Sequence, residues 1–272
     1  MDSKVLNINS SFLRWAGSKR QLVPKLSSFW NESYLRYIEP FAGSSVLFFN
    51  ISPSRAILSD INSELTLTYN EIKNNLEEVL GVLRKINIGK EEYLRLREIN
   101  PVDLSNHYRA ARFIYLNRFC FNGLYRTNRK GEFNVPYGGT SQKCGSLPSD
   151  DLFIACSKIL QNAEIINCDF EVTLEKAVEG DFVYLDPPYS VKNNRVFIEY
   201  SPSTFSIDSV NKIKDWISIL DRKGVKFLLS YAESEESEYL KRGFSWEIVE
   251  VKRNIAGFYS DRKIANEILI YN

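Results

Sequence analysis

Short apolar runs alternate with stretches of helical spacing along most of the chain. Apolar runs bounded by turn residues predict buried strands over residues 37–39, 56–58, 182–185 and 225–229. Apolar positions at helical spacing predict helices over residues 21–30, 63–84, 152–160 and 208–221. Strands that alternate with helices favour a parallel, doubly wound α/β sheet.

The pattern changes near the end of the chain. Residues 246–251 and 264–271 are two extended stretches that flank a polar loop. No helical pattern separates them, so we expect an antiparallel pair that completes the sheet.

The alternation also breaks between residues 91 and 148. A predicted helix over residues 105–119 is followed there by a segment rich in Gly, Asn and Arg. We interpret residues 85–148 as an insertion, so that residues 1–84 and 149–272 together form the domain that contains the sheet.

The composition is that of an ordinary globular enzyme. The chain has 272 residues, of which 44% are apolar and 25% charged, enough for one substantial core. It shows no signal peptide and no apolar stretch long enough for a membrane span. The closest pair of its four cysteines is twelve positions apart, which argues against a disulfide framework and favours reduced thiols in a cytoplasm.

Two further counts limit the chemistry. His107 is the only histidine, so the usual general base is missing and almost every zinc site is excluded; no metal is expected. The net charge is +1, but residues 104–148 hold seven basic residues against the single acid Glu132. That stretch carries +6, which leaves −5 for the rest of the chain. The localised positive charge favours a polyanion-binding lobe.

The tetrapeptide Asp186-Pro187-Pro188-Tyr189 directly follows a predicted strand, where open α/β sheets bind ligands. The prolines restrict the backbone and remove two N–H donors, so the carbonyl of Pro187 can project beside the carboxylate of Asp186. Such a pair can accept both N–H bonds of an exocyclic amine, and Tyr189 offers a flat face to a base swung out of a duplex. The alternative is a strand end with a capped turn, but four specific residues at one strand terminus favour catalysis.

Residues 37–45, YIEPFAGSS, predict a strand that enters a small-residue turn and then a helix from Val46. Gly43 would let a ligand approach the backbone closely. A dinucleotide site needs three glycines and only one is present, so the cofactor is expected to lack a pyrophosphate, as S-adenosylmethionine does. Asp60 ends the next strand, where an acid can bind ribose hydroxyls, although it can also cap a helix.

Residues 12–19, FLRWAGSK, cannot be aligned with a phosphate-binding P-loop. Taken alone, the stretch favours Trp15 as a core or rim aromatic residue and Lys19 as a solvated charge.

Together these stretches resemble the Dam-like family of DNA adenine-N6 methyltransferases, the D12 class with a DPPY motif. The shared motifs are RWAGSK, YIEPFAGSS, SDIN, YLNRFCFNGLYRTNRKGEFNVPYGG, FVYLDPPY and the closing NEILI. They follow the family's order over residues 12–272. The resemblance implies a Rossmann-like methyltransferase sheet that ends in an antiparallel hairpin. It also implies that residues 1–84 and 149–272 form the catalytic, cofactor-binding domain, and that residues 85–148 form a mainly helical DNA-recognition lobe.

The resemblance implies a role for particular residues. The expected S-adenosylmethionine contacts are Trp15, Lys19, Glu39, Phe41, Gly43, Asp60, Asp169, Phe170 and Asp186. The expected catalytic residues are Asp186, Pro187, Pro188 and Tyr189, and Asp169 and Phe170 are expected to line the pocket of the cofactor's adenine. The expected DNA contacts are Arg118, Phe121, Asn122, Leu124, Arg126, Asn128 and Pro136. Arg126 suits guanine, Leu124 and Pro136 suit a thymine methyl group, and Phe121 suits a wedge in the base stack.

The implied activity is methyl transfer from S-adenosylmethionine to N6 of a flipped-out adenine in double-stranded DNA, and the NGLYR and FNVPYG stretches point to GATC sites. Cytosine-N4 methylation and a catalytically silent DNA-binding protein are the alternatives; a nicotinamide dehydrogenase is disfavoured by the missing glycines. We expect a monomer that acts in the cytoplasm and has no membrane partner. Whether a cognate restriction endonuclease belongs to the same system is left open by the sequence. Two departures from the family pattern are Ser18 and the Ser230-Tyr231 pair.

Overall fold

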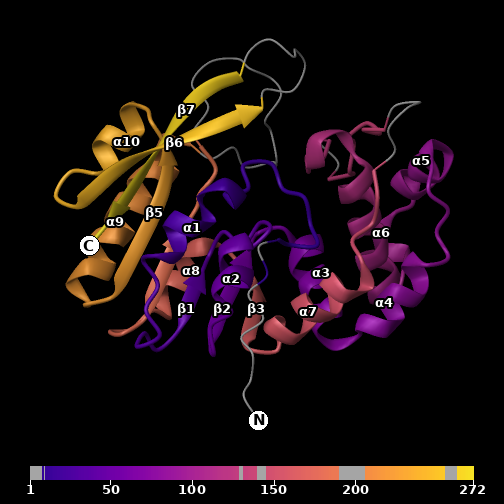
Figure 1. The fold of residues 1–272 in the computed structure, drawn as a ribbon, viewed down its shortest axis with the longest axis horizontal. Coiled ribbons are helices and arrows are strands. Elements are labelled where there is room, and N and C mark those ends of the chain that lie inside the picture. The colour runs from indigo at the N-terminus through magenta and orange to yellow at the C-terminus, as the bar shows by residue number, and fades with distance from the viewer. Residues whose placement is uncertain (1–7, 9, 129–130, 140–144, 190–205, 255–261) are drawn as a thin grey trace.

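The structure, a computed structural model, describes residues 8, 10–128, 131–139, 145–189, 206–254 and 262–272 (Figure 1). Its sheet has seven strands in the order β3-β2-β1-β4-β5-β7-β6. The strands are β1 (Tyr37–Glu39), β2 (Ala56–Asp60), β3 (Ala163–Asn167), β4 (Phe182–Leu185), β5 (Lys226–Ala232), β6 (Ser245–Asn254) and β7 (Arg262–Tyr271). The first five are parallel, whereas β7 is antiparallel to both β5 and β6. The expected doubly wound sheet with an antiparallel end is confirmed.

Ten α-helices lie within the described residues. They are α1 (Val23–Ser27), α2 (Val46–Ile51), α3 (Ser63–Asn74), α4 (Leu76–Leu83), α5 (Lys90–Glu98), α6 (Asn106–Phe119), α7 (Asp150–Leu160), α8 (Phe170–Glu175), α9 (Ile207–Arg222) and α10 (Glu235–Leu240). None of them is long and apolar enough to cross a membrane.

Two predicted helices differ from the structure, and one strand was not predicted. The helix predicted over residues 63–84 is two helices, because Asn75 leaves the helical conformation with φ −135° and ψ 42°. The helix predicted over residues 21–30 is a 3₁₀ turn followed by the five-residue α1. Strand β3 was missed because it is an edge strand with only Ala163 fully buried, which leaves a weak apolar signal.

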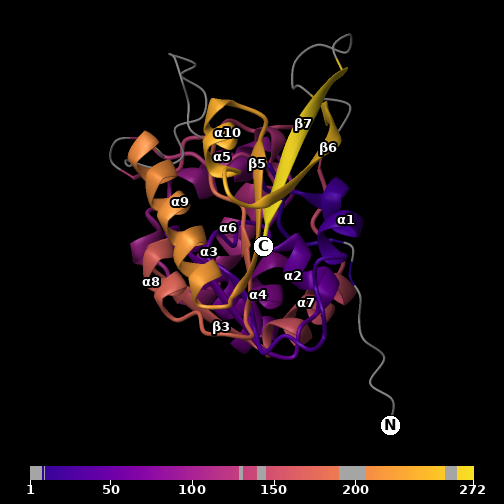
Figure 2. The same cartoon turned by 90° about the vertical axis from the view of Figure 1, so that its left-hand side faces the viewer.

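Both faces of the sheet are covered. Because strand side chains alternate between faces, Ile38 and Val183 pack under α8 and α9, whereas Tyr37 and Tyr184 belong to the core on the opposite face. Figure 2 shows α8 and α9 on one side of the sheet and α1, α2 and α7 on the other.

The expected insertion shares the second of these cores. Helix α6 packs against α3 and α4, and its Phe113 lies in the same hydrophobic cluster as Leu65 of α3 and Phe48 of α2. In Figure 1 these helices lie beside the β3 edge, away from the β6–β7 hairpin. The boundaries of 85 and 148 remain a prediction.

Cys120, Cys156 and Cys168 are free thiols, as expected; Cys144 lies outside the described residues.

Candidate active site

Strand register places the sequence motifs at one edge of the sheet. Ile38 of β1 pairs with Val183 of β4, and Glu39 pairs with Leu58 of β2. Beyond Glu39 the N–H of Ala42 donates to the carbonyl of Ser59 at 2.9 Å, which brings the turn after β1 beside Asp60 at the end of β2. Asp186 follows β4, the neighbour of β1 on its other side. Residues far apart in the chain therefore meet beyond the carboxyl ends of the strands.

Asp186 lies at the centre of a buried polar cluster. The Nζ of Lys19 is 2.7 Å from Oδ1 of Asp186 and also donates a hydrogen bond of 2.7 Å to the hydroxyl of Tyr189. The hydroxyl of Ser230 donates to the same Oδ1 at 3.1 Å. Lys19 is therefore a buried member of the site, and the prediction that it is a solvated charge was wrong.

Glu267 of β7 completes this group, although the sequence analysis gave it no role. Both of its carboxylate oxygens accept the Tyr189 hydroxyl, at 2.7 and 2.9 Å, and its Oε2 lies 3.8 Å from Nζ of Lys19. We call Lys19, Asp186, Tyr189 and Glu267 the Lys19 cluster. In the sequence Glu267 stood out only as the charged member of the closing NEILI motif, directly before an apolar run.

Burial and charge set the protonation of the Lys19 cluster. Burial raises the pKa of Asp186, and the charge of Lys19 offsets this only in part, so the net pKa is raised. Burial alone would lower the pKa of Lys19, but the nearby Asp186, Tyr189 and Glu267 outweigh it and the pKa is raised. Burial also raises the pKa of Tyr189. Lys19 thus stays charged, and Asp186 is a better proton acceptor than an exposed aspartate.

The Gly43 turn is built around Asp60. The backbone N–H of Gly43 donates to Oδ2 of Asp60 at 3.1 Å, and that of Asn62 donates to Oδ1 at 2.9 Å. Gly43 has φ +45°, and a Cβ there would lie 2.9 Å from Cδ1 of Trp15, so the indole lies directly on the turn. Asn62 caps helix α3, so the capping alternative for Asp60 is wrong.

Glu39 lies between these two groups. It is 2% exposed and accepts a hydrogen bond of 3.1 Å from the hydroxyl of Tyr37. Burial raises the pKa of Glu39 far above its usual value, and the charges of Asp186 and Asp60 raise it further. Glu39 is therefore in electrostatic contact with both aspartates.

The remaining expected cofactor residues lie on the α8 side of the sheet. The rings of Phe41 and Phe170 stack, with centroids 5.1 Å apart and an interplanar angle of 28°. The side chain of Asp169 accepts the backbone N–H of Glu171 and caps α8. Ser18, one of the departures, accepts a hydrogen bond from Ser44 and joins the two loops.

The expected recognition segment forms a hairpin-like loop. The N–H of Phe121 donates to the carbonyl of Pro136 at 2.9 Å, and Cys120 and Thr127 bridge to the returning chain. Phe121 is 43% exposed and Pro136 is exposed. Leu124 and Asn128 are half-buried, and Asn122 is exposed with a left-handed backbone.

Arg126 is held by the returning chain of this loop. Its Nε donates to Oδ1 of Asn134 at 2.8 Å, and its Nη2 donates to the backbone carbonyl of Asn134 at 3.3 Å. These bonds orient the guanidinium before any ligand binds.

Tyr125 connects this loop to the Gly43 turn, a link that the sequence did not signal. Its ring stacks on Trp15 with centroids 6.0 Å apart, and it also contacts Phe113 and Phe133. Burial raises the pKa of Tyr125 to about 12. The indole of Trp15 therefore lies between the turn and the loop.

The basic residues of the insertion divide into two groups. Arg109 is ion-paired with Glu64, and the buried Arg112 donates to the carbonyl of Leu96, so both have partners within the protein. Arg118 is partly buried, and burial together with the charges of Arg14 and Arg20 lowers its pKa to about 10.

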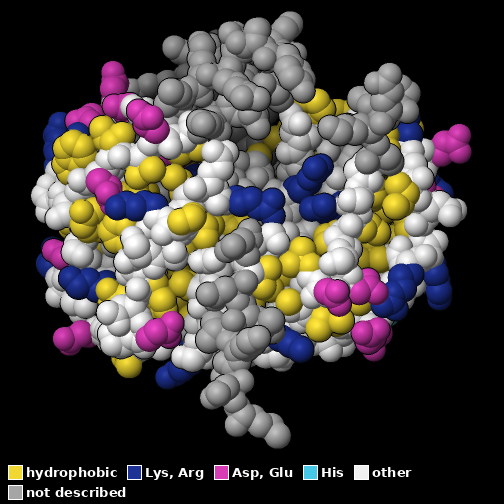
Figure 3. Space-filling model, in the orientation of Figure 1, with side chains coloured by type: hydrophobic (Ala, Val, Ile, Leu, Met, Phe, Trp, Pro, Cys, Tyr) yellow, Lys and Arg dark blue, Asp and Glu magenta, His cyan; other side chains and the backbone are white. Residues whose placement is uncertain are grey.

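Figure 3 shows Lys and Arg side chains near the middle of one face of the molecule. Arg118, Arg14 and Arg20 make a positive cluster to which the N-terminal stretch contributes two unpredicted members. Arg129, Lys130 and Lys143 lie outside the described residues.

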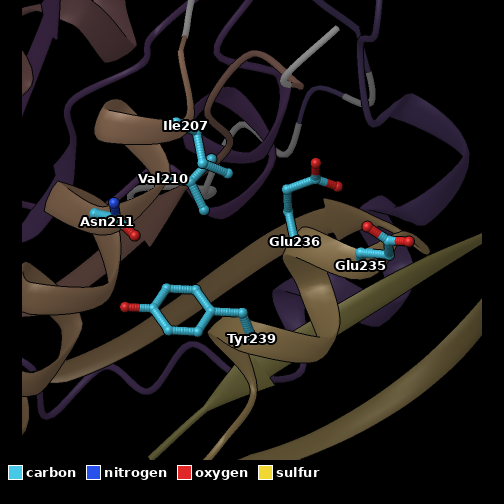
Figure 4. A pocket seen from close by; sticks show the side chains of 6 residues that line it. All are labelled: Ile207, Val210, Asn211, Glu235, Glu236 and Tyr239. Carbon is cyan, nitrogen blue, oxygen red and sulfur yellow. The ribbon is translucent and has the colours of Figure 1, made fainter. Parts of the chain in front are cut away.

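One pocket of about 270 Å³ lies elsewhere, between α9 and α10 (Figure 4). Its lining residues are Ile207, Val210, Asn211, Glu235, Glu236 and Tyr239, none of which the sequence singled out. No cluster of His, Cys, Asp and Glu able to hold a metal occurs among the described residues.

A doubly wound sheet with an antiparallel end and a DPPY tetrapeptide at its ligand-binding edge defines a Rossmann-like methyltransferase. The chain belongs to the family described as D12 class N6 adenine-specific DNA methyltransferase, whose sequence profile matches residues 15–255. It is therefore an enzyme that methylates adenine in DNA, and not a cytosine-N4 methyltransferase or a nicotinamide dehydrogenase.

Comparison with individual proteins agrees with the family. The chain is 37% identical over 270 residues to the Type II methyltransferase M1.LlaDCHI of Lactococcus lactis, covering 96% of this chain and 94% of that one. It is 32% identical to the DNA adenine methylase of Haemophilus influenzae, over 90% of this chain and 87% of that one. It is 30% identical to the DNA adenine methylase of Escherichia coli, over 96% and 94%.

Proposed function

We propose that the chain transfers the methyl group of S-adenosylmethionine to N6 of an adenine flipped out of duplex DNA, with Asp186 and Pro187 orienting the amine. The geometry of Asp186 is the main support, because both Lys19 and Ser230 approach its Oδ1. Oδ2 is then the oxygen that accepts one N–H bond, and the carbonyl of Pro187 accepts the other.

The product proton goes to Asp186 in this proposal. Attack of N6 on the methyl group forms an N–C bond, breaks the S–C bond and leaves a positive charge on N6. An N–H bond then breaks as an O–H bond forms on Oδ2 of Asp186. The raised pKa of Asp186 favours this step.

The residues around the Gly43 turn fit S-adenosylmethionine, which supplies an electrophilic methyl group on a sulfonium. Asp60 is already held by two backbone N–H groups, and its position at the end of β2 suits ribose hydroxyls. Phe41 and Phe170 provide an aromatic wall for the cofactor's adenine. Lys19 is proposed to pair with the carboxylate of the cofactor's methionine part, and it also orients Asp186 and Tyr189.

Residues 85–148 are proposed to recognise DNA, and residues 1–84 and 149–272 to carry cofactor and catalysis. Arg126, Leu124 and Pro136 then contact base edges, while Phe121, which is 43% exposed, enters the base stack. Arg118, Asn122 and Asn128 contact the backbone or bases beside them. GATC is the proposed site, from the NGLYR and FNVPYG stretches.

The setting of the enzyme follows from its substrate and relatives. We propose a monomer acting on DNA in the cytoplasm. One relative is named a Type II methyltransferase, which supports a restriction–modification system with a cognate endonuclease.

To test the proposal, DNA is incubated with the protein and methyl-tritiated S-adenosylmethionine, and the labelled nucleosides are identified. The same DNA is then digested with one nuclease that methylated GATC blocks and with another that requires methylated GATC. Label in N6-methyladenine and protection of GATC are expected. Label in cytosine would refute the chemistry, absence of label would indicate a silent binding protein, and full cutting by the methyl-blocked nuclease would refute GATC.

A further inference from the structure

Glu267 is a buried carboxylate at a position where the sheet favours an apolar side chain. It pairs with Ala232 of β5, and because strand side chains alternate, it shares a face with Leu269 of the core. Glu267 is 3% exposed. Burial of a carboxylate costs free energy unless partners compensate, so its partners indicate its purpose.

Among the described residues, its partners include two members of the proposed reactive site. Glu267 accepts the hydroxyl of Tyr189 with both oxygens and lies 3.8 Å from the ammonium of Lys19. Lys19 is also 2.7 Å from Asp186. One buried cation thus lies between two carboxylates that come from different strands.

The charges of this group change in step with the proposed reaction. Lys19 contributes +1 and the two carboxylates −1 each, so the Lys19 cluster carries −1 when it is empty. With a sulfonium donor bound, the Lys19 cluster and the sulfonium together are neutral. After transfer the sulfur is uncharged and Asp186 carries the proton, so the Lys19 cluster and the product sulfur together are again neutral. Without the charge of Glu267, the same groups would carry +1 both before and after transfer.

We infer that Glu267 is a positioning residue that balances the charge of Lys19, so that the site prefers a cationic methyl donor to its uncharged thioether product. This inference rests on the proposed function. Glu267 acts through Lys19 and Tyr189 and does not touch the reacting atoms itself.

Calorimetric titration without DNA tests the inference, using S-adenosylmethionine and S-adenosylhomocysteine as ligands. Glu267→Gln keeps the size of the side chain and an acceptor oxygen for Tyr189, but removes the charge. It should weaken binding of S-adenosylmethionine about tenfold more than binding of S-adenosylhomocysteine, the effect of one charge about 12 Å away at an effective dielectric constant of about 20. Equal losses for the two ligands, or no loss for either, would overturn the inference.

Three further variants separate charge from shape. Glu267→Asp keeps the charge and should keep the wild-type ratio of affinities. Glu267→Ala and Glu267→Met remove the same charge with other shapes and should reproduce the changed ratio, so the test does not depend on one variant folding.

Glu247→Gln is the matched control. It removes the same charge from the neighbouring strand β6, where Glu247 pairs with Lys25 at 2.7 Å, and should leave the ratio unchanged. Failure of the proposed function has a different signature: the wild-type protein would bind neither ligand and transfer no label.

Discussion

Replacement of Asp186 by Asn removes the charge at the centre of the site while keeping its shape. At an effective dielectric constant of about 20, charges 2.7 Å apart attract by about 6 kcal/mol, which is the gross interaction that Lys19 loses. Glu267, 3.8 Å from Lys19, still provides about 4 kcal/mol on the same scale. The burial cost of the Asp186 charge disappears as well, and the raised pKa shows that this cost exceeds the attraction. We therefore expect a melting temperature equal to or above that of the wild type.

Turnover should move in the opposite direction. The amide keeps one neutral acceptor for the substrate amine but loses both the charge-assisted hydrogen bond and the proton acceptor. We expect single-turnover methylation to slow about 10³-fold or more. In the wild-type enzyme the rate should fall as the pH drops through the raised pKa of Asp186, because the protonated acid can no longer take the product proton.

Single-turnover transfer of tritiated methyl, together with thermal unfolding, measures both effects. Asp215→Asn, an exposed change on α9, is the control and should alter neither. A rate for Asp186→Asn within tenfold of the wild type, or a large drop in melting temperature, would show that the reasoning about Asp186 is wrong.

Three other predictions follow. Gly43→Ala should weaken S-adenosylmethionine binding and cost about 1–2 kcal/mol of stability, because Gly43 has φ +45° and an added Cβ would meet Trp15. Gly17→Ala is the control and should leave binding unchanged, because Gly17 has φ +81° but an added Cβ there would meet no atom within 4 Å. The Glu39→Gln variant should become more stable relative to the wild type as the pH rises above about 4.5, by up to about 1.4 kcal/mol per pH unit. The reason is that the wild-type protein releases the proton of Glu39 when it unfolds, because the folded state has the higher pKa. Urea titrations at several pH values measure this difference, and curves of unfolding free energy against pH that run parallel for the two proteins would contradict it. Arg126→Ala should relax sequence choice by about 1–3 kcal/mol at one base pair in competition assays, and a uniform loss on all sequences would instead indicate a phosphate contact.

Local pattern was enough for most of the sheet and for its class. Strands β1, β2, β4 and β5 are apolar on both faces, as buried parallel strands must be, so their runs were visible in the sequence. The DPPY tetrapeptide and Gly43 were also visible, since prolines and small residues restrict the backbone where they stand. Edge strand β3, which is mostly only partly buried, lacked that signal.

Partnerships across the chain were decided by the tertiary structure alone. Nothing near Lys19 indicates that it pairs with Asp186, and nothing near Glu267 indicates that it shares Lys19 with that aspartate. Likewise, only packing shows that Arg112 is turned inward. The sequence determined the strands, the turns and the motif types, because these depend on neighbouring residues. Strand order and helix packing decided which side chains meet, because burial and ion pairing depend on distances between residues far apart in the chain.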